Sequence, residues 1–133
     1  MLRRRFACCL AVLVASAAFG PALAGDAFPF GSELILDAAP LRGSKRIPML
    51  QIEENGSASI DLWCARLHGQ VTVDDASITI VPVVTPQAPC DPDREVRDAT
   101  LLATLAQVTA WRRLGEVIEL SGPTTLRFRL MTN

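Results

Sequence analysis

The residues best suited to chemistry in this sequence are its four cysteines and its single histidine. Cys8 and Cys9 lie near the N-terminus, whereas Cys64 and Cys90 lie in the middle of the chain. The two later cysteines are too far apart for the Cys-x-x-Cys spacing that is typical of redox sites. In an oxidising compartment, a Cys64–Cys90 disulfide is their simplest use, and a redox pair or two free thiols are the alternatives.

His68 is the single histidine, and a lone histidine is more often a surface residue than a catalyst. A catalytic triad would need an activated serine or cysteine, and the glycine spacing of a nucleophile elbow is absent from the sequence. With the cysteines bridged, too few nitrogen and sulfur ligands remain for zinc. We therefore expect no catalytic residue at His68 and no metal or other cofactor.

The carboxylates also favour structural roles. Glu53-Glu54 and Asp74-Asp75 fall at expected hairpin turns, where solvation explains them. A further acidic group lacks the glycine and the terminal glutamate of a calcium-binding EF-hand loop. Helix capping explains its first members better than calcium binding does. This group consists of Asp91, Asp93, Glu95 and Asp98.

The N-terminus has the three-part pattern of a secretory signal peptide. Arg3–Arg5 is basic, Phe6–Phe19 is almost entirely apolar or small, and Pro21–Ala24 has small residues at the cleavage positions. The apolar run is shorter than the roughly 20 residues that a membrane-spanning helix needs, and Cys8 and Cys9 come too early for lipoprotein anchoring. We expect a signal peptide over residues 1–24, one domain over 25–133, and a periplasmic or secreted location.

Removal of residues 1–24 would change the charge of the protein. It would take away three arginines and no acid, leaving ten basic and fourteen acidic side chains and a net charge of −4 with histidine neutral. A mildly acidic domain is a poor match for nucleic acid or for an anionic membrane surface. We therefore expect no nucleic-acid partner and no stable membrane insertion after cleavage.

Alternating apolar residues predict a series of antiparallel hairpins after a first strand at Glu33–Asp37. Within residues 47–62, a turn with a left-handed Gly56 would place Leu50 opposite Ile60. A two-residue turn at Asp74-Asp75 would place Val71 opposite Ile78.

The last third of the chain returns to strands. Its hairpin would place Trp111 opposite Leu120 and Arg112 opposite Glu119, and Leu126–Leu130 would follow as a final strand. The arginines of these strands could form a basic patch for an acidic protein or envelope polymer, although a solvated sheet face is the favoured explanation. The candidate patch consists of Arg112, Arg113, Arg127 and Arg129.

One helix is expected, from Pro92 to Gln107, after the proline-rich connector Val81–Pro92. Asp91 is a suitable N-cap, and proline fits the first helical position. Apolar residues at spacings of three and four predict one face packed against a sheet. They are Val96, Ala99, Leu102, Ala103 and Ala106, widened by Leu101, Leu105 and Val108.

The order of the cysteines, the helix and the strands along the chain resembles that of the META domain, the family of the HslJ-like heat-shock proteins of bacterial envelopes. The similarity spans Glu33 to Leu130, although Trp63-Cys64-Ala65 stands where family members often read Gly-Cys-Asn. The resemblance implies a small domain with strands around one helix and a link to stress, motility or secretion. It depends on the positions of Cys64, Gly69, Thr85, Cys90, Leu102, Leu105, Trp111, Leu120, Leu126 and Phe128.

Pattern and resemblance together predict an α+β fold, with small antiparallel sheets or a partial barrel of hairpins packed on a single helix. We expect a non-enzymatic envelope protein that is stress-related or binds a protein or envelope component. Inhibition of a secreted hydrolase of the lysozyme type would need a protruding loop, for which Ala38–Arg46 and Pro82–Pro92 are long enough. A small-ligand carrier would instead need an enclosed apolar pocket.

Overall fold

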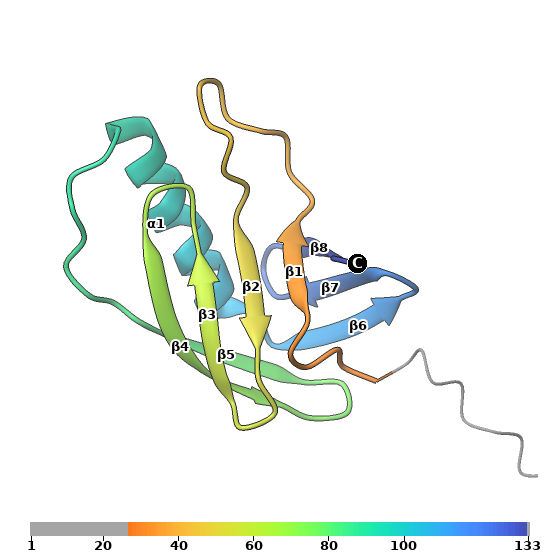
Figure 1. The fold of residues 1–133 in the computed structure, drawn as a ribbon. Helices are drawn as coiled ribbons and strands as arrows, with labels where there is room; N and C mark the ends of the chain where they lie inside the picture. The colour runs from red at the N-terminus through yellow and green to blue at the C-terminus, as the bar shows by residue number, and fades with distance from the viewer. Residues whose placement is uncertain (1–26, 133) are drawn as a thin grey trace, which may run out of the picture.

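A computed structural model describes residues 27–132 of the chain, and the predicted signal peptide with Cys8 and Cys9 lies outside this range. Figure 1 shows strands that curl around one side of a single helix. The elements are β1 (Glu33–Leu36), β2 (Met49–Ile52), β3 (Ser57–Asp61), β4 (Arg66–Val73), β5 (Ile78–Val83), α1 (Pro92–Gln107), β6 (Ala110–Leu114), β7 (Val117–Ser121) and β8 (Leu126–Leu130).

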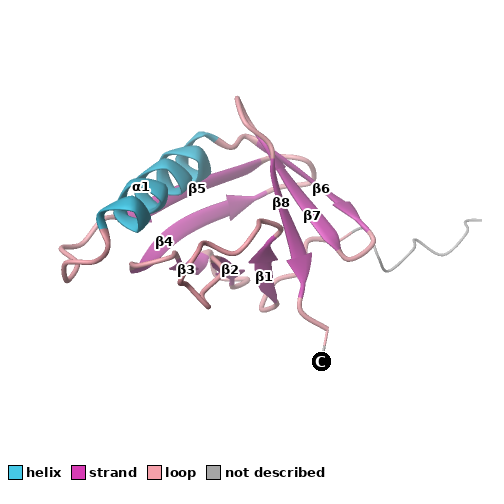
Figure 2. Cartoon of the chain, turned by 90° about the horizontal axis from the view of Figure 1, so that it is seen from above, coloured by secondary structure: helices cyan, strands magenta, loops and turns pink. Residues whose placement is uncertain are grey.

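All eight described strands form one antiparallel sheet, in the order β5-β4-β3-β2-β1-β8-β7-β6. The short strand β1 joins the two halves, because Leu34 faces Leu50 of β2 while Leu36 faces Phe128 of β8. The predicted α+β class is therefore wrong. The chain is mainly β, a half-barrel with one helix, and Figure 2 shows the curl of the sheet from above.

The two edge strands approach each other at one end of the sheet. Ser77, just before β5, forms an isolated bridge with Ala110 of β6. The Ile78 amide donates to the Thr109 carbonyl at 3.1 Å, and the Trp111 amide donates to the Ala76 carbonyl at 3.1 Å. Beyond this point the edges diverge, and α1 packs against β5. The helix thus fills part of the opening that keeps the sheet from closing as a barrel.

The concave face of the sheet holds the core. Alternate residues of each strand point inward, as expected for a sheet with one covered face. Leu101 and Leu105 of α1 complete the core from the helix side. The side chains with almost no exposed surface include Leu34, Leu50, Ile52, Ile60, Leu62, Ile78, Ile80, Ile118, Leu120 and Phe128.

The hairpin registers test the sequence predictions directly. Leu50 faces Ile60, as predicted for a left-handed Gly56, and Trp111 faces Leu120. The β4–β5 register is different, because Val71 faces Ile80 rather than Ile78. Its turn spans residues 74–77 instead of two residues. A two-residue hairpin turn needs positive φ angles, and no described residue other than glycine has one.

The helix has the predicted bounds and N-cap, but a different buried face. The Asp91 carboxylate accepts bonds from the Asp93 and Arg94 amides at 3.0 and 3.3 Å. The centre of the predicted stripe is wrong, since Val96 is 66% exposed, but Leu101, Leu105 and Val108, which widened it, are buried as expected. The side chains that α1 buries are Asp98, Leu101 and Leu105. A carboxylate thus lies in the row that faces the sheet.

Gly56 should tolerate alanine less well than Gly115 does. Both have positive φ angles, +86° and +64°, but only at Gly56 would a Cβ atom meet backbone, 2.8 Å from the Val71 carbonyl oxygen. We expect Gly115→Ala to cost about 1 kcal/mol of unfolding free energy from backbone strain alone. Gly56→Ala should cost roughly 2–3 kcal/mol. Urea unfolding of both variants measures the difference, and equal costs would contradict the predicted clash.

Candidate functional site

The connection between β3 and β4 is held by one buried carboxylate of the helix. Asp98 accepts three hydrogen bonds from consecutive backbone amides, those of Trp63 at 2.8 Å, Cys64 at 2.9 Å and Ala65 at 2.8 Å. The Leu62 amide closes the same turn by donating to the Ala65 carbonyl at 2.8 Å. Asp98 is only 6% exposed. The turn and the helix are therefore joined by three short hydrogen bonds, one buried and two partly buried.

A disulfide joins the same turn to the residue before the helix cap. Cys64 and Cys90 are bonded, with their Cα atoms 6.1 Å apart, as predicted. The Cys90 amide also donates to the Glu95 carboxylate at 2.9 Å. The disulfide and Asp98 thus attach one short connection to the N-terminal half of α1 at two separate places.

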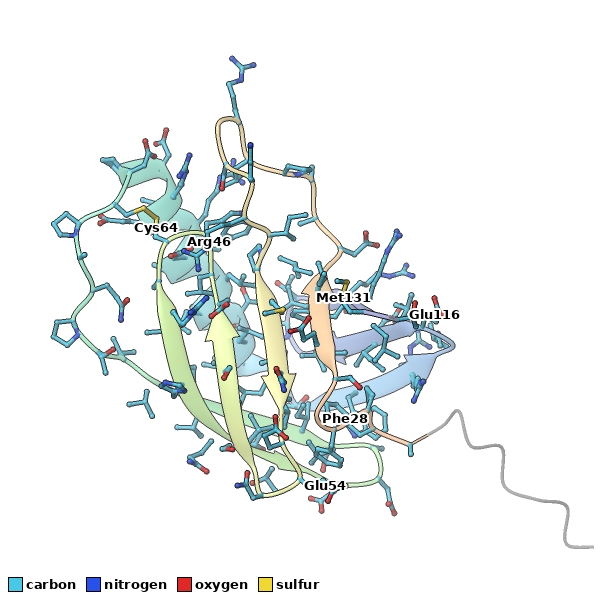
Figure 3. The ribbon with its side chains drawn as sticks, in the orientation of Figure 1. Phe28, Arg46, Glu54, Cys64, Glu116 and Met131 are labelled. Atoms are coloured by element: carbon cyan, nitrogen blue, oxygen red, sulfur yellow. A yellow bond between two sulfur atoms is a disulfide. The ribbon has the colours of Figure 1, made fainter. Side chains whose placement is uncertain are left out.

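The β1–β2 loop (residues 37–48) projects beyond the neighbouring strands at this end of the molecule (Figure 1). It is anchored to the elements beside it. The Arg94 guanidinium donates to the Gly43 carbonyl at 2.8 Å, and the Arg46 guanidinium donates to the Cys64 carbonyl at 3.3 Å. Leu41 packs against the core. Figure 3 shows Arg46 beside Cys64. The loop therefore protrudes but is anchored to the rest of the domain.

Three cations of this loop face solvent. Arg42, Lys45 and Arg46 are exposed. None of them takes part in an ion pair within residues 27–132. The carboxylate at the base of the loop, Asp37, already pairs with Arg129 at 3.1 Å. The loop thus presents exposed positive charge that forms no salt bridge within the described part of the chain, with Asp91 and Asp93 in the same surface pocket as Arg42.

The predicted arginine patch is only partly assembled. Arg112 and Arg127 flank Glu119 across three neighbouring strands, at 2.6 and 3.8 Å from its carboxylate. Arg129 lies on the same outer face and pairs with Asp37. Arg113 lies opposite the buried Ile118, on the other face of the sheet, and donates to backbone carbonyls. The three arginines that share a face are therefore each paired with a carboxylate, but two of them share Glu119.

The other sequence candidates stay apart from one another. His68 is exposed on β4, opposite Ser59 and Val83. The two acidic pairs lie at the β2–β3 and β4–β5 turns, as predicted. No three possible metal ligands gather anywhere in residues 27–132. Across that same range, the model contains no helix with the length and hydropathy of a membrane span.

Sequence reasoning missed the two residues that organise this end of the domain. In the sequence, Asp98 belongs to the acidic group weighed for calcium binding and helix capping, and Arg94 has no predicted role. A signal for Asp98 was present, because it lies three and seven residues before Leu101 and Leu105 on one helical face. An acid in the row of buried positions indicates a carboxylate with backbone partners.

Comparison with known proteins is informative about the family and the fold. No curated protein matches the chain. One protein solved by NMR is 18% identical, with a TM-score of 0.57 over 75% of this chain and 89% of its own. An NMR structure from Burkholderia xenovorans is 17% identical, with a TM-score of 0.58 over 78% of this chain and 84% of its own. At these identities the likeness supports the fold alone.

The sequence model of the META domain family matches residues 32–132, nearly all of the described chain. The match agrees with the resemblance inferred from the positions of the cysteines, Trp111 and the final strand. This chain therefore belongs to the META domain family.

Proposed function

We propose that this protein is an exported, non-enzymatic binding domain of the bacterial envelope that docks a protein partner on its β1–β2 loop. The N-terminal signal pattern and the Cys64–Cys90 disulfide support export, because disulfides persist mainly in oxidising compartments. The stress-related role implied by the family resemblance would then be exercised through this contact.

The anchored, protruding β1–β2 loop is the observation that carries the proposal. The loop is held by two hydrogen bonds, from Arg94 and Arg46, and by the packing of Leu41. It therefore has little conformational freedom left to lose on binding. Its exposed cations, Arg42 and Lys45, favour a partner with an acidic surface. Because the positive charge stands out from a domain of negative net charge, it would also orient the approach of such a partner.

Inhibition of a secreted hydrolase is the second candidate. Most glycosidases carry two carboxylates in their active-site cleft. A narrow loop with Arg42 near its turn at residues 41–44 fits such a cleft in both shape and charge. In this version the loop would occupy the cleft and exclude substrate, with no chemistry by the domain itself.

Capture of partners from an envelope extract tests the loop. The native protein should retain a partner that the double variant Arg42→Ala/Lys45→Ala loses by about tenfold or more, a loss of roughly 1.4 kcal/mol. The control, Arg66→Ala/Arg127→Ala, removes two exposed cations whose side chains do not contact the loop and should retain the partner. Equal retention by both variants would refute the role of the loop. In a parallel assay, a lysozyme unaffected by the native protein would exclude lysozyme inhibition.

A further inference from the structure

A second surface, separate from the β1–β2 loop, is an open groove beside the helix. It has a volume of about 440 Å³, within the range of small-ligand sites. Leu36 at the end of β1, Trp63 of the β3–β4 turn, and Leu101 of α1 form its buried floor. Leu126 at the start of β8 forms the opposite wall. The groove therefore lies where α1 and the strands leave the half-barrel open.

The two threonines of α1 that line the groove do not make its wall strongly polar, because their hydroxyls are hydrogen-bonded within the helix. Thr100 and Thr104 line the groove one turn apart. Their hydroxyls donate to the carbonyls of Val96 and Thr100, each at 2.9 Å, four residues earlier in the helix. Both hydroxyl protons are therefore already used within α1. The helix wall offers few free hydrogen-bond donors to a ligand.

Arg97 is the single charged side chain that lines the groove within the described residues. It lies one turn before Thr100 and Leu101 on the same side of α1, and it is exposed. It takes part in none of the ion pairs within residues 27–132. Asp91 and Asp93 line a neighbouring pocket together with Arg97, but no salt bridge joins them to it. An apolar trough with one unpaired cation at its edge matches a ligand with one apolar part and one negative group.

We propose that this groove binds a single-chain anionic amphiphile, with the alkyl chain on Trp63, Leu101 and Leu126 and the carboxylate at Arg97. An extended peptide fits less well. Its many backbone amides and carbonyls would lose water against walls whose polar side chains are one arginine and three threonines, too few to pair with them all, which is costly. A hydrocarbon chain has no such groups, and its burial is favourable in proportion to its area.

Titration calorimetry with dodecanoate, below its micelle concentration, tests the charge requirement. The native protein should bind one dodecanoate saturably, and about two- to fivefold more tightly than the neutral dodecanol, as expected for a solvent-exposed ion pair. Arg97→Gln should remove this preference and leave dodecanol binding unchanged. No saturable binding, or an equal affinity of the native protein for both probes, would overturn the proposal.

Filling the groove tests its location. Thr104→Trp places an indole in the groove and should weaken dodecanoate binding by about tenfold or more, the effect of losing roughly 1.4 kcal/mol of contact. Ala103→Trp makes the same kind of change at the adjacent, exposed position and should bind like the native protein. Thr100→Trp serves as the second blocking variant if Thr104→Trp does not fold, as judged by circular dichroism. Native affinity in a folded blocking variant would overturn the assignment.

Discussion

Replacing Asp98 by alanine should lower the free energy of unfolding by roughly 3–5 kcal/mol, one of the largest effects expected of any single substitution here. The reason is that its buried carboxylate accepts hydrogen bonds from the amides of Trp63, Cys64 and Ala65. Alanine leaves the buried Trp63 amide and the partly buried Cys64 and Ala65 amides without these partners, and an unsatisfied buried donor costs about 1–3 kcal/mol. The turn between β3 and β4 would also lose its attachment to α1.

An asparagine variant separates the shape of the side chain from its charge. Asp98 uses both oxygens, one for Trp63 and the other for Cys64 and Ala65. In Asp98→Asn, one oxygen becomes an amino group that faces backbone donors. We therefore expect a substantial loss of stability even in this nearly isosteric variant.

Chemical denaturation with a fluorescence readout of the tryptophans would measure the effect of both Asp98 variants. Asp75→Ala is the matched control, because Asp75 is exposed at the β4–β5 turn and should change stability by about 0.5 kcal/mol or less. If Asp98→Ala unfolds at the same denaturant concentration as the control, the three bonds do not stabilise the domain as inferred.

Local pattern explains why some elements could be read from the sequence. The α1 bounds follow from Asp91 and Pro92, which favour a helix start through capping and a preset φ angle. The β2–β3 register follows from Gly56, since an αL residue there keeps both apolar sets on one face. Each of these signals lies within a few residues of the feature that it predicts.

The fold class depended on contacts that no local pattern contains. Strand β1 pairs with β2 and also with β8, which lies at the other end of the chain. Without that pairing, the local patterns predict hairpins in separate small sheets around a helix. With it, they become one curled sheet, and α1 becomes a single element beside an edge.

The candidate site shows the same division. The Cys64–Cys90 bridge could be predicted because few other uses remain for two cysteines in a domain that the N-terminal pattern predicts to be exported. The partners of Asp98 and Arg94 could not, because they are backbone groups of distant turns, and backbone carries no sequence signature. The groove likewise depends on how α1 meets Leu36 and Leu126.

Loss of the Cys64–Cys90 disulfide should reduce the free energy of unfolding by about 3 kcal/mol. The bridge closes a loop with a sequence separation of 26 that contains β4, β5 and the connector to α1. Most of the loss comes from the greater freedom of the unfolded chain. The double variant Cys64→Ala/Cys90→Ala and the reduced native protein should therefore unfold at similar denaturant concentrations.

Mass spectrometry of protein isolated from the periplasm checks the bridge and the processing of the leader together. After treatment with an alkylating reagent under non-reducing conditions, the expected mass is that of residues 25–133 with no alkyl group added. Two alkylated thiols in the folded protein would refute the bridge. A mass that includes residues 1–24 would refute cleavage after Ala24.

The bridge and Asp98 should not act independently, because both hold Cys64. Its amide donates to Asp98 while its sulfur is bonded to Cys90. Once either restraint is lost, the turn can move away from α1, and the other restraint can no longer contribute fully. A double-mutant cycle between Asp98→Ala and the cysteine double variant should thus yield a coupling of about 0.5–3 kcal/mol. The combined loss would be smaller than the sum of the separate losses. Additive losses would mean that the turn keeps its position on one restraint alone.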